Sequence, residues 1–389
     1  METTIKENDG ASQMRVIQVT EDVLNKYKKA YKKYGEYYRK LYEKEFKKGI
    51  FKYSLTNLYG RISTRLPKSI TIISIKGGTG KTTLSLLLAS MLSIVFECRV
   101  YQIDFNFVNN DLTRYIVPGA YGIIRRKGNS IHLYRDTRDI SDFHTLREYL
   151  LDDSIKPDDV IYDTTIPNLS FIPIGGNSDM DKIVTETLKE AYEGKKSNYL
   201  RRIEEMLKKL EEERPIIIFD GGNIDHIKSM PLLISDVCIC VIDVNRDPYD
   251  DLAYFVETIE KYNEKFRRPI GYGPIKAGVV LSQVLGKIIS ARKVLKFKKT
   301  WDDALNELLR KARLHGLVEN IINGGMNFLG ILLFDDYIKL CGLLDMRKTL
   351  SGEKEWTVED PLLKEDAHRR DVVKSFLYWV FPKIVFNIL

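Results

Sequence analysis

The sequence predicts an α/β protein with a doubly wound, mostly parallel sheet. Apolar, β-branched runs of strand length recur along the chain, and stretches with helical periodicity separate them. Continuous apolar runs are typical of strands that are buried on both faces, and their alternation with helices favours a parallel sheet covered on both sides. We expect strands at 69–75, 98–104, 169–175, 215–220, 237–244, 276–282 and 328–334, and helices at 81–96, 179–192, 197–213, 249–265 and 301–322.

Length and composition describe a globular protein. The chain has 389 residues, of which 44% are hydrophobic and 30% are charged, as in soluble domains. No apolar run reaches the length of about 18 residues that spans a bilayer, and the first residues do not resemble a secretion signal. Cys98, Cys238, Cys240 and Cys341 lie in apolar segments, and a C-x-C pair in a strand points to opposite faces, which is poor metal geometry. We therefore predict a cytoplasmic protein with buried, reduced thiols.

The positive charge is concentrated near the N-terminus. The net charge is +7, and residues 21–52 contain eleven basic and five acidic residues. Residues 1–18 are expected to be a weakly ordered lead, and a helix is expected from Glu21 to about Lys48 because apolar residues, mostly tyrosines, recur every three or four positions. The lysines could contact nucleic-acid phosphates, or the tyrosines could pack on the rest of the protein while the lysines stay solvated. The two interpretations are compatible.

These patterns suggest a division of the chain into two parts. We predict a basic, tyrosine-rich helical arm over 1–67 and one large domain over 68–389. Two stretches within that domain read as insertions, one near 120–150, which is basic around Arg125-Arg126-Lys127, and one near 284–326.

The stretch SIKGGTGKTT, residues 74–83, has the character of a phosphate-binding loop. It follows a predicted buried strand and opens a predicted helix, the context in which backbone N–H groups cradle phosphate oxygens. We expect Lys81 to contact the phosphates and the Thr82 hydroxyl to contact Mg²⁺. The remaining nucleotide-binding candidates are Lys76, Gly77, Gly78, Thr79, Gly80 and Thr83. The alternative is a glycine-rich turn with a purely structural purpose.

The loop departs from the common pattern G-x-x-x-x-G-K-[ST] in a specific way. Ile75 occupies the position of the first glycine, and an additional lysine, Lys76, follows it. The pattern K-G-G-x-G-K-T-T resembles the deviant Walker A motif of the ParA/MinD family of P-loop ATPases. Further segments resemble that family in the same order along about 69–345, namely 100–113, 171–175, 215–222, 234–259, 278–282 and 328–340, and the resemblance extends in weaker form to 369–389.

The resemblance implies roles for individual residues. In that family two subunits bind ATP face to face, so Lys76 is expected to reach the partner's phosphates, as an arginine finger does; the alternative is a solvated lysine. Asp104 matches the first aspartate of the switch segment and Asp220 matches the Walker B aspartate, so Thr82, Asp104 and Asp220 are the candidate Mg²⁺ ligands.

Some positions differ from the family pattern. Asn106 occupies the position of the aspartate that orients the attacking water, and an amide cannot accept that proton, so hydrolysis is expected to be slow. Gly221 and Gly222 replace prolines, which suggests a looser switch. Ser282 and Leu333 replace a base-reading asparagine and a proline, so a preference for adenine follows from the family resemblance alone.

The resemblance implies a function, with alternatives. We expect an ATPase that uses ATP and Mg²⁺, forms an ATP-dependent homodimer, binds DNA without sequence preference, and acts with a centromere-binding or activator protein in segregation of a plasmid or other replicon. It would lie on the nucleoid in the cytoplasm. The alternatives are a MinD-like positioning ATPase that binds membranes, or a slow nucleotide-gated switch. The apolar C-terminus, 372–389, is expected to be a core helix, since Lys374 and Lys383 are too few for a basic membrane-binding face.

Overall fold

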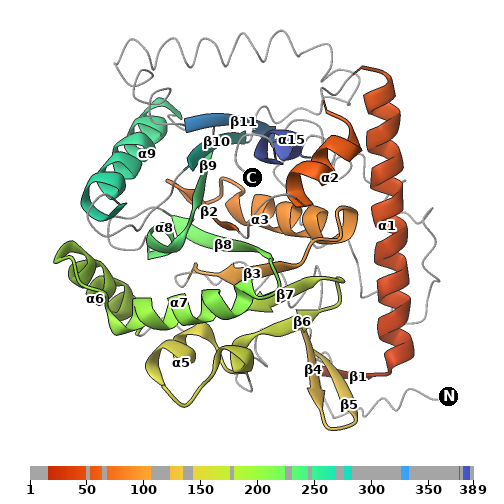
Figure 1. Cartoon of the computed structure of the whole chain (residues 1–389), viewed down its shortest axis with the longest axis horizontal. Coiled ribbons are helices and arrows are strands. Elements are labelled where there is room, and N and C mark those ends of the chain that lie inside the picture. Colours follow the sequence, from red (N-terminus) through yellow and green to blue (C-terminus); the bar gives the residue numbers. More distant parts are fainter. Residues whose placement is uncertain are drawn as a thin grey trace, which may run out of the picture.

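The computed structural model describes residues 16–49, 53–63, 68–106, 123–134, 143–175, 179–223, 230–243, 248–267, 276–282, 326–332, 376 and 380–385. The described strands form one eleven-stranded sheet in the order β1-β5-β4-β6-β7-β3-β8-β2-β9-β10-β11 (Figure 1). Their bounds are β1 Val16–Val19, β2 Lys68–Ser74, β3 Val100–Asp104, β4 Ile123–Lys127, β5 Ser130–Tyr134, β6 Tyr162–Thr164, β7 Leu169–Ile172, β8 Ile216–Asn223, β9 Val237–Asp243, β10 Lys276–Ser282 and β11 Met326–Leu332.

Helices cover both faces of this sheet. The described helical segments are α1 Glu21–Lys47, α2 Leu55–Ser63, α3 Lys81–Ser90, η1 Met91–Val95, α5 Leu146–Leu151, η4 Pro157–Val160, α6 Met180–Tyr192, α7 Asn198–Glu211, α8 Met230–Ile234, α9 Pro248–Tyr262, η5 Asn263–Arg267 and α15 Phe381–Lys383. One core cluster includes side chains of α1, α2, α3, η1 and α15, and a second includes side chains of α5 to α9. The doubly wound α/β class is therefore confirmed.

In the order of the sheet, the strands β7-β3-β8-β2-β9-β10-β11 are all parallel, and they are the ones that the sequence predicts. Each of the seven predicted strands coincides with an observed one, and the helices predicted at 179–192, 197–213 and 249–265 are α6, α7 and α9. In β9, Val237, Ile239 and Val241 pack into one core cluster while Cys238 and Cys240 pack into the other. Both faces are apolar because both are covered. The helix predicted at 301–322 lies outside the described residues.

The other edge of the sheet is antiparallel, which the sequence did not indicate. β4 and β5 form a hairpin, β4 pairs with β6, and β6 pairs with β7. This hairpin lies in the stretch predicted as an insertion near 120–150, and it extends the main sheet. β1 pairs with β5 at the edge, so the expectation of a weakly ordered lead over 1–18 is wrong for residues 16–18, which lie in β1. The insertion predicted near 284–326 falls almost wholly outside the described residues.

Helix α1 runs along one side of the molecule and packs through its tyrosines (Figure 1). Tyr27, Tyr31, Tyr34, Tyr38 and Tyr42 are all buried, in the core cluster that also contains side chains of β2, β3 and α3. The tyrosine stripe therefore packs on the rest of the protein, as one of the two interpretations of this helix requires.

Polar contacts fix the position of α1 against η1. A Cβ atom added at Gly35 would lie 2.4 Å from the carbonyl oxygen of Ile94, so only glycine allows the two backbones to approach so closely. Arg39 donates a hydrogen bond to the carbonyl oxygen of Val95 at 2.7 Å and pairs with Glu97 at 3.2 Å. The far end of the segment that begins at the phosphate loop is thus held directly by α1.

The described part of the C-terminal segment lies in the core. Phe376, Val380, Phe381, Ile384 and Val385 are fully buried. Phe381 stacks on Phe96, which follows η1, with ring centroids 4.9 Å apart. Among the described helices none is long and apolar enough to cross a membrane.

The described cysteines are free thiols in apolar surroundings. Burial raises the pKa of the Cys98 thiol to about 12 and raises the pKa values of Cys238 and Cys240 well above the usual range. These thiols are therefore protonated and packed at neutral pH. Cys341 lies outside the described residues.

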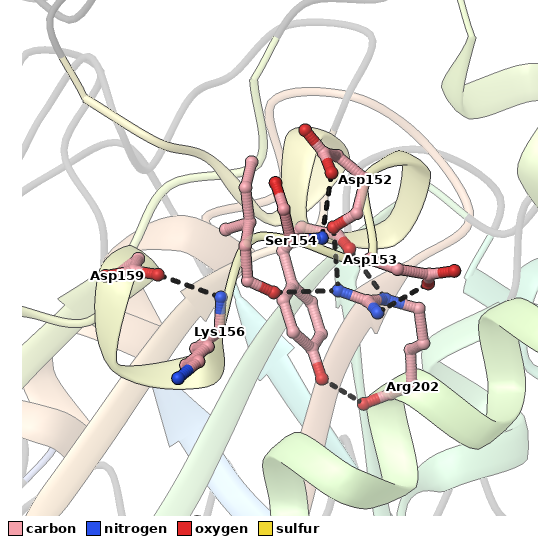
Figure 2. A network of polar contacts seen from close by, with 8 residues as sticks. Asp152, Asp153, Ser154, Lys156, Asp159 and Arg202 are labelled. Carbon is pink, nitrogen blue, oxygen red and sulfur yellow. Dashed lines mark hydrogen bonds and ion pairs between the residues drawn. The ribbon is translucent and has the colours of Figure 1, made fainter.

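A buried arginine ties α7 to the turn that follows α5 (Figure 2). Both helices pack on the face of the sheet opposite α1. Arg202 is 8% exposed and donates to the carbonyl oxygens of Tyr149, Asp152 and Ile155 at 2.7, 3.0 and 2.9 Å. It also donates to a carboxylate oxygen of Asp153 at 2.7 Å. One planar guanidinium thereby pairs three backbone carbonyls that the turn leaves without helical partners.

Candidate functional site: a phosphate-binding loop beside two buried carboxylates

The glycine-rich loop connects the end of β2 to the start of α3. Gly78 and Gly80 have φ angles of 75° and 89°, in the left-handed region that favours glycine. The Ser74 hydroxyl donates to the carbonyl oxygen of Lys76 at 2.9 Å, and the Leu84 amide donates to the carbonyl oxygen of Gly80 at 2.9 Å. The loop therefore turns tightly and leads directly into the first turn of α3, as predicted.

The candidate nucleotide residues differ in exposure. Gly77 and Gly78 are exposed, whereas the Thr79, Lys81 and Thr82 residues are 2%, 7% and 7% exposed. Lys76, Gly80 and Thr83 are intermediate. The tip of the loop faces outward, and its lysine and threonine at the helix start point toward the neighbouring strands.

Two buried carboxylates lie side by side next to this helix start. Asp104 ends β3, Asp220 lies on β8, and the two are directly paired in the strand register. Both are fully buried. Lys81 Nζ lies 3.6 Å from Asp220 Oδ1 and 3.3 Å from Thr82 Oγ1, to which it donates. The structure thus brings together Lys81, Thr82 and Asp220, and places Asp104 on the adjacent strand.

Asn106 connects the ends of these two strands. The backbone N–H of Asn106 donates to Asp104 Oδ1 at 3.0 Å, and the backbone N–H of Phe105 donates to the carbonyl oxygen of Asp220 at 2.9 Å. A Cβ atom added at Gly222, where φ is 74°, would lie 3.3 Å from Asn106 Oδ1. Asn106 therefore packs against the strand end that carries Asp220.

The two glycines after Asp220 have steric roles. β8 continues through both of them to Asn223. A Cβ atom added at Gly221 would lie 2.8 Å from Ile73 Cγ2 and 2.9 Å from Thr71 Cγ2. The prediction of a looser switch considered only the absence of proline, whereas Gly221 of β8 packs tightly against β2.

Lys76 is held by an ion pair that the sequence did not predict. Its Nζ lies 3.0 Å from Asp251 Oδ1, and the exposed fractions of the two side chains are 36% and 4%. Asp251 lies in the first turn of α9. Within the described part of the chain, its second oxygen, Oδ2, is buried and accepts no hydrogen bond. The only sequence signal was the pair of aspartates in the stretch RDPYDDL.

A protein-family model described as an AAA domain matches residues 67–271, more than half of the 389-residue chain. The chain belongs to this family. With the deviant loop at the end of β2, the match confirms the recognition of a ParA/MinD-type P-loop protein. No curated protein matches the sequence significantly.

Several solved structures are similar to this ParA/MinD-type protein. A plasmid partition protein from Borrelia burgdorferi bound to AMPPNP is 19% identical with a TM-score of 0.44, over 80% of this chain and 99% of that chain. The cell division ATPase MinD of Pyrococcus furiosus is 17% identical with a TM-score of 0.45, over 82% and 98%. An ATP complex of McdA from Cyanothece is 20% identical with a TM-score of 0.43, over 62% and 79%.

The residues present in the ParA/MinD-type site fit a nucleotide and Mg²⁺. A left-handed glycine loop at a helix N-terminus offers N–H donors and a positive dipole end to phosphates, and Lys81 adds a buried cation. Hydroxyl and carboxylate oxygens of Thr82, Asp104 and Asp220 are the ligand type that Mg²⁺ prefers. No cluster of three or more acidic, histidine or cysteine residues that could hold a metal occurs among the described residues. Mg²⁺ would therefore need phosphate oxygens and water to complete its shell, as is usual for this ion.

Proposed function

We propose that this ParA/MinD-type protein is an ATP-dependent dimerising ATPase that binds DNA without sequence preference and acts in segregation of a plasmid or other replicon. Its partners would be a second copy of the chain, DNA, and a centromere-binding or activator protein, and it would lie on the nucleoid in the cytoplasm. The observation that carries the proposal is the grouping of Lys81, Thr82 and Asp220 at 3.3–3.6 Å directly behind a loop that carries a second lysine.

The residues of the site have separable tasks in this proposal. Lys81 exchanges its pairing with Asp220 for the phosphate oxygens of ATP, which leaves the Asp220 and Asp104 carboxylates to support the Mg²⁺ shell with Thr82. Bound Mg²⁺ supplies a positive charge that neutralises the phosphates. Lys76 lies outside this group and is partly exposed, as a residue that serves the partner subunit's phosphates must be.

Hydrolysis is proposed to be slow. Asn106 lies beside Asp104 and Gly222, where the family resemblance places the residue that orients water. An amide can hold a water molecule but cannot take its proton, so general-base assistance, worth about 10²–10⁴-fold in rate, is absent from this position. A long-lived ATP-bound dimer would follow, which also favours the second candidate function, a nucleotide-gated switch with little turnover.

The membrane-positioning alternative finds less support. The apolar side chains of the C-terminal segment that are described, from Phe376 to Val385, are fully buried in the core. A membrane-binding helix needs an exposed apolar face.

Sedimentation of the purified protein with ATP and Mg²⁺ tests the proposal. The wild type should form dimers with ATP, Lys81→Ala should bind no ATP, and Lys76→Ala should bind ATP as a monomer without forming dimers. Dimers of Lys76→Ala would show that the lysine has no role in trans. A wild type that remains monomeric in ATP would contradict the dimerisation mechanism as a whole.

A further inference from the structure

The outward face of α1 carries a row of lysines. At 3.6 residues per turn, six of them fall within a sector of about 60° of the helix. We call Lys26, Lys29, Lys33, Lys40, Lys44 and Lys47 the lysine row; all six are exposed. At 1.5 Å per residue the row is roughly 32 Å long. Glu36 and Glu43 lie along one of its edges.

The row is fixed in place by the opposite side of the same helix. The tyrosines are buried, and Gly35 lies against the backbone of η1. The other basic residues of α1 are Lys28 and Lys32, which are exposed outside the row, and Arg39, which is turned inward to Val95 and Glu97. Within the described part of the chain no acidic side chain lies within 4 Å of a lysine-row amine. The row is therefore a rigid line of positive charge to which the described residues bring no carboxylate within ion-pair distance.

We infer that the lysine row is a binding surface for the phosphate backbone of duplex DNA. This inference rests on the DNA partner in the proposed function and assigns the contact to α1. A duplex carries one phosphate per about 1.7 Å of its axis, so a stretch as long as the row offers more phosphates than the row has lysines. Contacts of this kind position a protein on DNA and carry no sequence information.

Other kinds of partner fit the row less well. An interfacial membrane helix needs a free apolar face, and the apolar face of α1 is occupied by the core. Protein interfaces depend on a few buried aromatic or apolar anchors. Among the described residues the exposed large hydrophobic side chains are Leu151 and Tyr192, neither of which is on α1. A partner that recognises this face must do so through charge alone, as a nucleic-acid backbone does.

The test compares two variants in which three lysines are replaced by glutamine. In one variant the three lysines belong to the row, and in the other they lie outside it. The row variant is Lys29→Gln, Lys33→Gln and Lys40→Gln. The control variant is Lys182→Gln, Lys189→Gln and Lys208→Gln, which are exposed on α6 and α7 across the sheet and change the net charge equally. Glutamine is a good helix former, so both variants should fold and dimerise in ATP as the wild type does.

The readout is the affinity for a mixed-sequence DNA duplex, measured in ATP over a series of salt concentrations. Each lost phosphate contact lowers the slope of log K against log salt by about 0.9, so the row variant should lose about 2.7 from the slope, or roughly 10²-fold or more in affinity at 0.1 M salt. The control variant should keep the wild-type slope.

The remaining outcomes would overturn the inference in distinguishable ways. Equal effects of the two variants would indicate that net charge alone is responsible. ATP-dependent DNA binding that the row variant leaves unchanged would place the DNA surface elsewhere and leave the proposed function standing. If the wild type binds no DNA in ATP, DNA is not a partner of this protein and that part of the proposed function fails. Lys81→Ala, which should bind no ATP, is the control for the nucleotide dependence of any DNA binding. Phosphatidylserine vesicles that bind the wild type but not the row variant, without DNA binding, would reassign the row to a membrane.

Discussion

Replacing Asp251 by asparagine should make the ATP-dependent dimer tighter. The Asp251 carboxylate holds Lys76 at 3.0 Å within its own subunit, whereas the proposed dimer needs that lysine at the partner's phosphates. Each subunit must therefore break this ion pair on dimerisation, and Asp251→Asn removes the competing charge while keeping the shape of the side chain.

The geometry sets the size of the effect. The carboxylate is almost fully buried, but the lysine side chain is 36% exposed, so the pair lies between an exposed salt bridge and a buried charge-assisted hydrogen bond. Such a pair contributes about 1 kcal/mol. Two subunits give about 2 kcal/mol, which corresponds to about a 30-fold lower dimer dissociation constant.

Analytical ultracentrifugation in ATP, over a range of protein concentrations, measures this constant. Glu257→Gln is the matched control, because Glu257 also lies on α9 and pairs with Lys261 at 3.9 Å, but both side chains are more than half exposed. That variant should leave the dissociation constant unchanged. If Asp251→Asn dimerises no more tightly than the wild type, the pair survives dimerisation and the competition described above does not exist.

Three further substitutions, with Gly60→Ala as the control for one of them, test the site and the core. Asn106→Asp should raise steady-state phosphate release roughly tenfold or more with little change in ATP affinity, because it restores a carboxylate next to Asp104; a neutral or slower variant of a brisk wild type would show that another residue orients the water. Gly221→Ala should lower the free energy of unfolding by about 1–3 kcal/mol in urea, since its Cβ would meet side chains at 2.8–2.9 Å. Gly60→Ala, which has open space in α2, should be neutral or slightly stabilising. Arg202→Leu should cost about 2–4 kcal/mol by the same measurement, because it leaves three carbonyl groups without their donor, whereas the Asp153 carboxylate is 85% exposed and stays hydrated; a loss below 1 kcal/mol would show that water replaces the guanidinium.

The sequence predicted the parallel half of the fold because its signal is local. A strand buried on both faces is largely apolar, and β8, β9 and β10 each contain this signal as an uninterrupted apolar run. β1 and β4 lack that signal. Only four residues form β1, and its place in the sheet depends on pairing with β5, more than a hundred residues away. β4 carries two arginines and a lysine, and its hairpin with β5 is indicated in the sequence only by a Gly-Asn turn.

The site divides in the same way. Lys81, Thr82, Asp104 and Asp220 could be predicted because each follows a strand or opens a helix at a fixed spacing, and parallel strands bring such ends together. Asp251 could not be predicted, because it is 175 positions from Lys76 along the chain and the approach of α9 to the loop is a property of tertiary packing. The steric need for Gly221 is likewise visible only once β2 lies beside it.

The position of α1 has a consequence for how the chain folds during its synthesis. The helix leaves the ribosome well before the groups that pack with its tyrosines: Ile94 and Val95 follow, and then Thr165, whose hydroxyl meets the Tyr31 hydroxyl at 3.5 Å. A helix with five tyrosines on one side and lysines on the other must therefore wait in solution while well over a hundred further residues are translated. At about 5–20 residues per second that interval lasts on the order of ten seconds. During it the lysines keep the nascent helix soluble, so the charge that faces outward in the finished protein also protects its unfinished core.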